Sequence, residues 1–246
     1  MQYRPFVLSG GGCRGAAHLG AIKAFHERDI SPSEIAGTSA GAIAGAFLAN
    51  GFTPDEIKEL FVTALKPHLP TWTGLKIGTM AMENLRIFLK KNLRYKSFEE
   101  LTIPFYITAT NFIDGRQIIF NRGEIIDKVI AACSIPIIFP LALIDDIPYV
   151  DGGISNNLPV EPFIGRQKEV VSIYVNPLKL FSPHVNAIDI MDRTFHLIHR
   201  EMIERSAAGC FVYIEPPELH SIGLFDIHKI PDAFDIAYRY TKELLK

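Results

Sequence analysis

Glu34-Ile35-Ala36-Gly37-Thr38-Ser39-Ala40-Gly41 is the stretch of this sequence that decides the fold. Residues 34–37 are typical of a short buried strand, and the small residues of 40–50 predict a helix that packs closely on a sheet. Between the two, Gly37, Ser39 and Gly41 have the G-x-S-x-G spacing of a sharp strand-to-helix turn that exposes a serine hydroxyl. The stretch therefore predicts an α/β unit with Ser39 as a candidate nucleophile.

A second glycine loop, Gly10-Gly11-Gly12-Cys13-Arg14-Gly15, lies upstream, between a predicted strand over 5–9 and a predicted helix over 15–28. A serine that attacks an ester carbonyl creates a negatively charged oxygen, which preorganised backbone N–H groups stabilise. Glycines let the loop turn its N–H groups inward, and the helix that follows adds its positive dipole end. Because both loops are expected at the carboxyl ends of neighbouring parallel strands, the second loop is interpreted as an oxyanion hole beside Ser39.

Strands and helices alternate along the rest of the chain, which predicts a three-layer α/β/α fold with a mostly parallel central sheet. No linker divides the sequence, so we expect one domain over residues 1–246. Further strands are expected at 104–110, 116–121, 142–144, 149–150, 169–175 and 211–214, and further helices at 83–93, 124–132, 187–207 and 231–245. Thr53 is the predicted N-cap of another helix, whereas two prolines and two glycines predict irregular backbone over 66–79.

Composition and charge narrow the classes of function. The 246 residues are 48% hydrophobic and carry a net charge of −2, which gives no overall attraction to nucleic acid or to anionic membranes. Cys13, Cys133 and Cys210 lack metal-ligand spacing and are expected to be small buried residues in a reducing compartment. The sequence has neither a signal-peptide core nor an apolar run near the roughly 20 residues of a membrane span. We therefore expect a cytoplasmic protein, with export without a cleavable signal as the alternative.

Four sequence blocks, taken in order, resemble those of the patatin-like phospholipases, lipid acyl hydrolases that use a serine–aspartate dyad. The blocks are the Gly10–Gly15 loop, the turn around Ser39, Ala131-Ala132-Cys133-Ser134-Ile135-Pro136, and Asp151-Gly152-Gly153 followed by Ile154–Pro159. The resemblance covers about residues 5–163. It implies a patatin-like fold, a phospholipid or other acyl-ester substrate, peripheral contact with membranes, and neither metal nor cofactor. Many members begin the first block with aspartate where this chain has Ser9, a change that leaves the loop donors in place.

The resemblance also implies roles for individual residues. Ser39 is the expected nucleophile and Asp151 the expected base, and the oxyanion hole is expected from the N–H groups of Gly11, Gly12 and Cys13. The glycines that shape the motifs are Gly10, Gly15, Gly37, Gly41, Gly152 and Gly153. An ordinary aspartate has a pKa near 4, a poor match to a serine hydroxyl, so burial must raise the pKa of Asp151. We accordingly expect activity to rise toward alkaline pH.

Other polar residues near these blocks have less specific interpretations. Arg14 either binds a lipid phosphate near the oxyanion loop or forms a salt bridge on the surface of the first helix. Ser134 is expected to be structural, and Asn156 and Asn157 are expected to hold the turn after Asp151.

The histidines leave a Ser-His-Asp triad formally open. His184, His196, His199 and His220 follow Asp151 in the chain, but none lies in a glycine-bounded turn at an expected strand end. His196 and His199 are expected to be surface or partly buried helix residues, with metal binding as a minor alternative. His18 and His26 are expected in solvated or capping positions.

The walls of the substrate site are the least determined part of the sequence. The candidates are the loop 70–75 with Trp72, the connection 181–184 and the segment 219–225. Three alternative functions stay open: a carboxylesterase or thioesterase acting on soluble acyl substrates, a non-catalytic lipid-binding protein, and a dinucleotide-binding protein. The last is disfavoured, because no acidic residue ends the second predicted strand.

Overall fold

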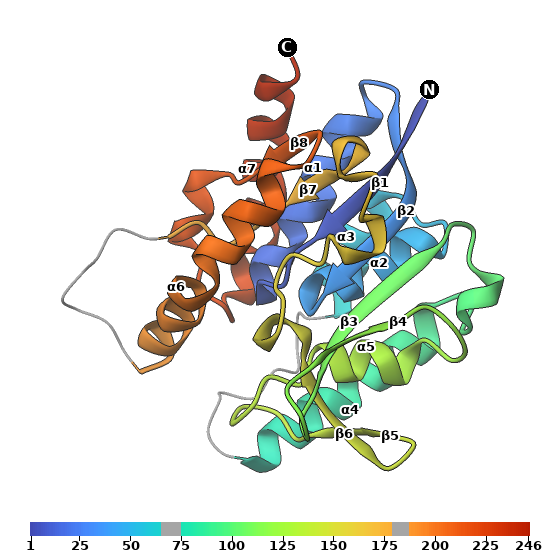
Figure 1. The fold of residues 1–246 in the computed structure, drawn as a ribbon, viewed down its shortest axis with the longest axis vertical. Helices are drawn as coiled ribbons and strands as arrows, with labels where there is room; N and C mark the ends of the chain where they lie inside the picture. The colour runs from blue at the N-terminus through green and yellow to red at the C-terminus, as the bar shows by residue number, and fades with distance from the viewer. Residues whose placement is uncertain (65–74, 179–186) are drawn as a thin grey trace.

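The computed structural model describes residues 1–64, 75–178 and 187–246 and contains a central sheet with helices on both faces (Figure 1). The sheet order is β5-β6-β3-β2-β1-β7-β8, and β4 pairs with β3 beside this path. The strands are β1 Gln2–Leu8, β2 Ile30–Thr38, β3 Phe105–Asn111, β4 Gln117–Phe120, β5 Ala142–Ile144, β6 Ile147–Asp151, β7 Val171–Ile173 and β8 Val212–Ile214. The predicted three-layer α/β fold is confirmed.

The sheet is parallel in its centre and antiparallel at one end. β3, β2, β1, β7 and β8 pair in parallel, whereas β4, β5 and β6 join through antiparallel pairs. The predicted turn at Asp114-Gly115 connects β3 to β4, and Gly115 adopts the positive φ of 72° that such a turn requires. The antiparallel end includes β6, whose last residue is Asp151.

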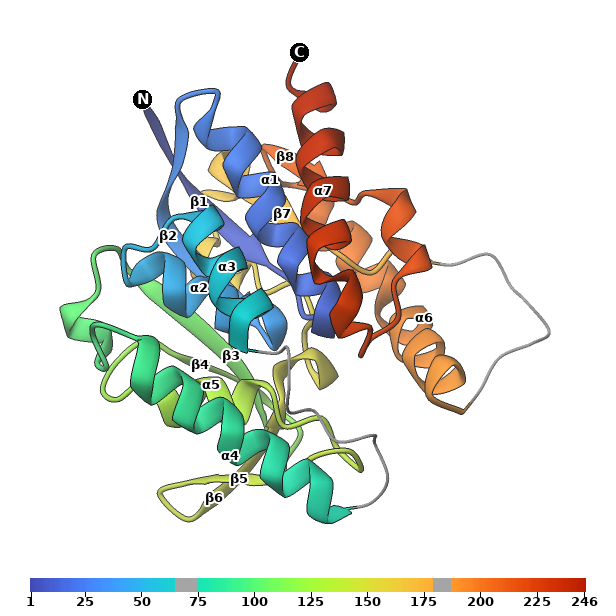
Figure 2. The same cartoon turned by 180° about the vertical axis from the view of Figure 1, so that it is seen from behind.

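Most helices cover the face seen in Figure 2. The helices are α1 Ala16–His26, α2 Ala40–Ala49, α3 Pro54–Ala64, α4 Leu75–Asn92, α5 Ile126–Ala132, α6 Ala187–Ala208 and α7 Ile230–Leu244. The larger apolar core joins α1, α2, α5 and α7 to this face, whereas Ile203 of α6 packs with Val7, Tyr174 and Phe163 on the other. None of the described helices is both long and apolar enough to cross a membrane.

The sequence explains where α3 begins and how closely α2 packs on the sheet. Thr53 caps α3 as predicted, because its hydroxyl accepts the Glu56 N–H while the Glu56 carboxylate accepts the Thr53 N–H at 2.8 Å. The small residues of α2 bring that helix close to the sheet. A side chain at Gly45 would place its Cβ 2.5 Å from the Phe105 ring.

Three elements begin clearly earlier than predicted, namely α4, β1 and β2. Residues 75–79 are helical, because α4 begins at Leu75 rather than near residue 83 and accommodates Gly78 in its interior. β1 and β2 are longer at their amino-terminal ends, where their backbones pair from Gln2 and Ile30 although their side chains are more exposed. The Trp72 loop and the 181–184 connection lie outside the described residues.

Candidate active site

Ser39 occupies a strained turn between β2 and α2. Its φ of 53° and ψ of −122° are unfavourable for a residue with a side chain. The flanking glycines are required by contact distances: a Cβ at Gly37 would lie 2.5 Å from the Gly41 oxygen, and a Cβ at Gly41 would lie 2.3 Å from the Leu8 oxygen. The backbone therefore holds Ser39 in a conformation that local preference would not select.

Asp151 meets this turn because β2 and β6 run toward each other along one side of β3. Thr38, the last residue of β2, pairs with Thr108, and Asp151, the last residue of β6, pairs with the next residue, Ala109. The ends of the two strands thus occupy consecutive register positions of β3. A Cβ at Gly152 would lie 2.1 Å from the Thr108 oxygen, so only glycine fits immediately after Asp151.

Burial sets the electrostatics of Asp151. It raises the pKa of this carboxyl from 3.8 to about 6, and the Ser39 hydroxyl and the Gly153 N–H act in the opposite direction. Oδ1 accepts the Gly153 N–H at 2.8 Å. Oδ2 is buried and has no donor in hydrogen-bond geometry among the described residues. Asp151 therefore has one oxygen fixed by a backbone donor and one oxygen without a donor in the described part of the chain.

The glycine loop after β1 begins beside Ser39. A Cβ at Gly10 would lie 3.0 Å from the Ser39 Cβ. Within the described part of the chain, the Gly11 and Gly12 N–H groups have no acceptor, and Gly12 has a positive φ of 56°. Cys13 differs from the expectation, because its N–H already donates to the Leu224 oxygen at 2.9 Å. Leu224 belongs to the segment 219–225 that the sequence suggested as a wall of the site.

Arg14 is buried rather than exposed, which contradicts a surface salt bridge. Its Nη2 donates to His196 Nε2 at 3.4 Å. Nε2 is then the acceptor, so a neutral His196 carries its proton on Nδ1, 3.1 Å from the Tyr174 hydroxyl. These contacts connect the glycine loop itself, through the turn Gly12–Gly15, to α6 and to the segment after β7.

The other histidines give no support to a triad. His199 bonds the Phe195 and Ile154 oxygens, and the exposed His220 bonds the Pro217 oxygen. His184 lies outside the described residues. The solvated position expected for His18 is wrong: the side chain is fully buried, bonds the Ser9 oxygen at 2.8 Å, and has its pKa lowered by burial to about 4.

Two polar residues of the third and fourth blocks have the expected structural roles. The Ser134 hydroxyl donates to the Ile130 oxygen, and the Ser134 carbonyl accepts the Asp151 N–H at 2.9 Å. Asn156 holds the local turn by accepting the Leu158 N–H. Asn157 connects this turn to the glycine loop, because its Oδ1 accepts the Gly10 N–H at 3.0 Å. The sequence did not indicate this contact.

Ser9 and Asn176 were missed as candidates for the site. Both are buried, and both donate a side-chain hydrogen bond to the Gly10 carbonyl. Nothing in the sequence around Asn176 signals this contact, since the two partners are 166 positions apart.

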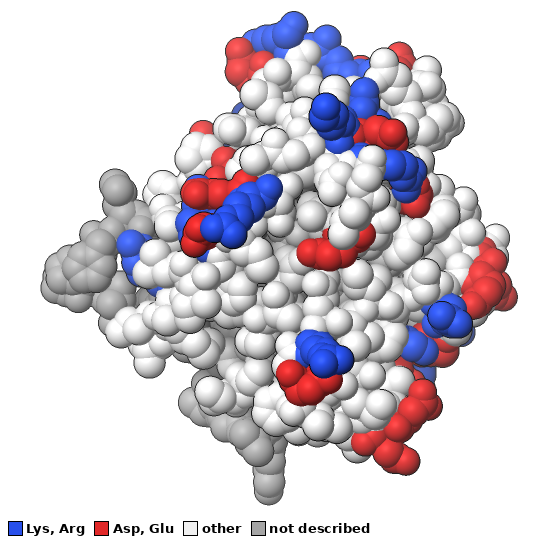
Figure 3. Space-filling model, viewed as in Figure 1, with Lys and Arg blue, Asp and Glu red and all other residues white. Residues whose placement is uncertain are grey.

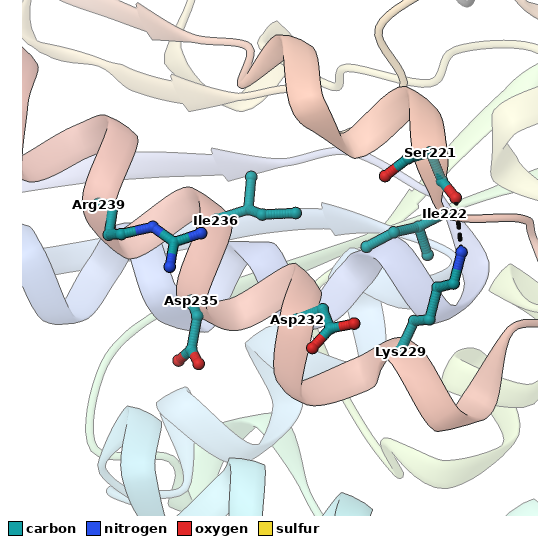
Figure 4. A pocket seen from close by; sticks show the side chains of 7 residues that line it. All are labelled: Ser221, Ile222, Lys229, Asp232, Asp235, Ile236 and Arg239. Atoms are coloured by element: carbon teal, nitrogen blue, oxygen red, sulfur yellow. Dashed lines mark hydrogen bonds between the residues drawn. The ribbon is translucent and has the colours of Figure 1, made fainter.

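A separate pocket of about 240 Å³ lies between α7 and the turn Pro217–Ser221 (Figure 4). Its lining comprises Ser221, Ile222, Lys229, Asp232, Asp235, Ile236 and Arg239. Lys229 Nζ donates to the Ser221 oxygen at 2.9 Å across one end. The pocket contains neither Ser39 nor Asp151, and its charges are of both signs.

Several known proteins resemble this chain in sequence. The family model of patatin-like phospholipases matches residues 6–164. An uncharacterized NTE family protein of Mycobacterium tuberculosis is 27% identical over 74% of this chain and 52% of its own length. The lysophospholipase NTE1 of Kluyveromyces lactis is 27% identical over 98% of this chain. The chain thus spans about half of the first relative and 19% of the second.

A solved structure supports the fold assignment. The crystal structure of VipD from Legionella pneumophila matches with a TM-score of 0.57 and 15% identity, and the match covers all of this chain and 67% of VipD. At this identity the likeness concerns the architecture of the chain. The match extends past residue 164 and therefore includes β7, α6, β8 and α7.

Proposed function

Because the chain belongs to the patatin-like phospholipase family, we propose that it is a lipid acyl hydrolase of the phospholipase A type, with Ser39 as nucleophile and Asp151 as base. The observation that carries the proposal is the meeting of β2 and β6 on consecutive positions of β3, which brings a strained serine to a buried carboxylate. Neither feature benefits stability, since positive φ and a buried charge both cost free energy. Their coincidence at one point is typical of a catalytic site.

The proposed reaction has two steps. Asp151 Oδ2 accepts the Ser39 proton as Ser39 Oγ attacks the ester carbonyl, and the N–H groups of Gly11 and Gly12 stabilise the resulting oxyanion. Collapse of this intermediate breaks the ester bond, leaves the acyl group on Ser39, and returns the proton from Asp151 to the departing lysolipid oxygen. A water deprotonated by Asp151 then attacks the acyl-enzyme carbonyl. As the bond to Ser39 Oγ breaks and the fatty acid leaves, Asp151 returns this proton to Ser39 Oγ and the resting enzyme is restored.

We also propose peripheral contact with a lipid surface through the segment 129–144, at its exposed residues after Ser134. Residues 129–144 include no charged side chain, and Ile137 is 85% exposed with a positive φ of 73°. Leu141 and Leu143 of the same segment are exposed as well. The face drawn in Figure 3 has its charges in small groups of both signs around a broad uncharged area. Such a surface suits insertion of apolar side chains better than electrostatic attraction.

Vesicle cosedimentation of Ile137→Asn tests the lipid contact. Asparagine tolerates positive φ and removes the apolar side chain, so binding should fall while the fold is retained. Ile164→Asn is the matched control: Ile164 is 72% exposed but close in sequence to Arg166, which bonds Glu34 in the middle of β2. Equal loss of binding in both variants would contradict a specific role of the 129–144 segment.

A phospholipid with different acyl chains at its two ester positions tests the hydrolase. Mass spectrometry of the products should detect a fatty acid with the wild type, none with Ser39→Ala, and a yield lowered by several orders of magnitude with Asp151→Asn. The chain released identifies the ester position. Release by Ser39→Ala at the wild-type rate would overturn the proposal.

The principal alternative is an esterase or thioesterase for soluble acyl substrates. The dyad geometry serves both chemistries equally. Cleavage of a short-chain monomeric ester without any action on micellar phospholipid would favour this alternative, and no cleavage of either would favour a non-catalytic lipid-binding protein.

A further inference from the structure

The peptide group between Gly10 and Gly11 follows β1 and lies between the ends of the two neighbouring strands, β2 and β7. β1 is flanked by β2 on one side and by β7 on the other. Ser39 follows β2, and Asn176 follows β7, so the loop after β1 has the nucleophile on one side and a buried asparagine on the other.

The Gly10 carbonyl is held toward the β7 side by two donors. Asn176 Nδ2 donates to it at 2.7 Å and Ser9 Oγ at 3.0 Å. The Ser9 oxygen is itself positioned, because it accepts the Val175 N–H at 3.1 Å. An aspartate at position 9, as in many family members, has no proton to donate to a carbonyl when ionised. This arrangement therefore depends on the serine of this chain.

We propose, on the premise of the function above, that Asn176 and Ser9 are positioning residues that aim the Gly11 N–H into the oxyanion hole. In a planar trans peptide the C=O and the next N–H point in opposite directions. A Gly10 carbonyl fixed toward Asn176 directs the Gly11 N–H to the opposite side of the loop, where Ser39 lies.

Contacts of the preceding peptide group and of the Gly11 backbone restrict the loop further. The Gly10 N–H donates to Asn157 Oδ1, so the loop is held from the Asp151 turn as well. A Cβ at Gly11 would lie 2.5 Å from Val175 Cγ2 and 2.9 Å from Asn176 Oδ1, so the backbone packs directly on the residues that hold it. The Gly11 donor is thus fixed before substrate binds, which is the condition for effective oxyanion stabilisation.

The test uses Asn176→Ala and Ser9→Ala in the full chain. Each removes one donor to the Gly10 carbonyl and leaves Ser39 and Asp151 unchanged. We measure kcat and KM on a monomeric p-nitrophenyl ester, together with the rate at which a fluorophosphonate modifies Ser39. A displaced oxyanion donor should lower kcat and the modification rate by about 10- to 100-fold with KM changed less than about threefold.

Two buried residues away from the loop provide matched controls. Asn50 is buried, donates Nδ2 to the Ala46 oxygen and accepts the Tyr95 N–H, and Ser172 is buried and donates to the Val212 oxygen. Asn50→Ala and Ser172→Ala should lower Tm without lowering kcat by more than about twofold. If Asn176→Ala does not fold, Asn176→Leu keeps the volume and Ser9→Ala tests the same carbonyl.

The outcomes separate this inference from the proposed function. A wild type that neither hydrolyses the ester nor reacts with the fluorophosphonate overturns both. An active wild type with Asn176→Ala and Ser9→Ala at wild-type kcat overturns the positioning role alone. Equal losses of kcat in the site variants and in the controls would assign the effect to general destabilisation and would also overturn it. Restoration of kcat by Ser9→Thr, which keeps the hydroxyl, would support it.

Discussion

The turn that holds Ser39 and the turn that holds Asp151 reach the same point by different physical means. At Ser39 the cost lies in the backbone, since φ is 53° and two glycines pack against neighbouring carbonyls. At Asp151 the backbone is ordinary, with φ of −46°, and the cost lies in burial of a carboxylate whose pKa is raised to about 6. The proposed nucleophile is thus positioned by backbone strain, and the pKa of the proposed base is set by desolvation.

Asp151→Asn should have the largest effect and should separate activity from stability. Loss of the base should lower kcat by about 10⁴-fold, the upper range of general-base contributions. The folded protein should nevertheless gain stability at pH 7, because a shift of about two pKa units corresponds to about 3 kcal/mol of cost for the ionised group. Urea unfolding of the inactive variant beside the wild type measures this gain.

The gain in stability from Asp151→Asn should depend on pH. The folded pKa of Asp151 is raised, so the cost is fully present above about pH 6 and disappears as pH falls below the unfolded value near 4. Asp151→Asn should therefore be more stable than the wild type at pH 7 and about equal at pH 4. A variant less stable at pH 7 would show that the ionised carboxylate contributes net stability.

The rate profile should report the same carboxyl. Since the proposed base must be ionised, kcat/KM should fall about tenfold per pH unit below about pH 6 and level off above pH 7. A pKa of about 6 thus places the rise below neutral pH, and not in the alkaline range expected from the sequence. The residual activity of Asp151→Asn should lack this step. A wild-type profile that is flat from pH 5 to 8 would assign the base to another group.

The glycines of the two turns should be intolerant of a single methyl group. Gly41→Ala and Gly152→Ala place a Cβ 2.3 Å and 2.1 Å from backbone oxygens, so each should lower the free energy of unfolding by about 3 kcal/mol or more. Gly209→Ala is the control, because its Cβ would meet only Gln167 at 3.5 Å. Similar Tm values for all three variants would mean that the turns relax, and the close packing would not explain the motif glycines.

These contacts explain which parts of the molecule could be predicted from the sequence. Gly37, Gly41 and Gly152 are visible in the sequence because each close approach admits only glycine. The alternation of strands and helices likewise follows from local periodicity. Asn176 could not be predicted, because an asparagine after a strand has many uses and only the order β2-β1-β7 brings it to Gly10. The bond from the Cys13 N–H to the Leu224 oxygen could not be predicted for the same reason, since Leu224 is distant in sequence.

Glycine and alanine substitutions at positions 39 and 151 test the same comparison through the smallest expected difference in stability. Ser39→Gly and Ser39→Ala both lose the nucleophile, but only alanine keeps the Cβ that the positive φ disfavours, at a cost of about 1–3 kcal/mol. Glycine loses about 0.5–1 kcal/mol through the greater freedom of its unfolded chain. Ser39→Gly should therefore be the more stable of the pair by about 1 kcal/mol. At Asp151, where φ is −46°, the order should reverse and alanine should exceed glycine. Urea unfolding of the four variants measures both orders, and the same order at both positions would remove the distinction between a strained nucleophile and a desolvated base.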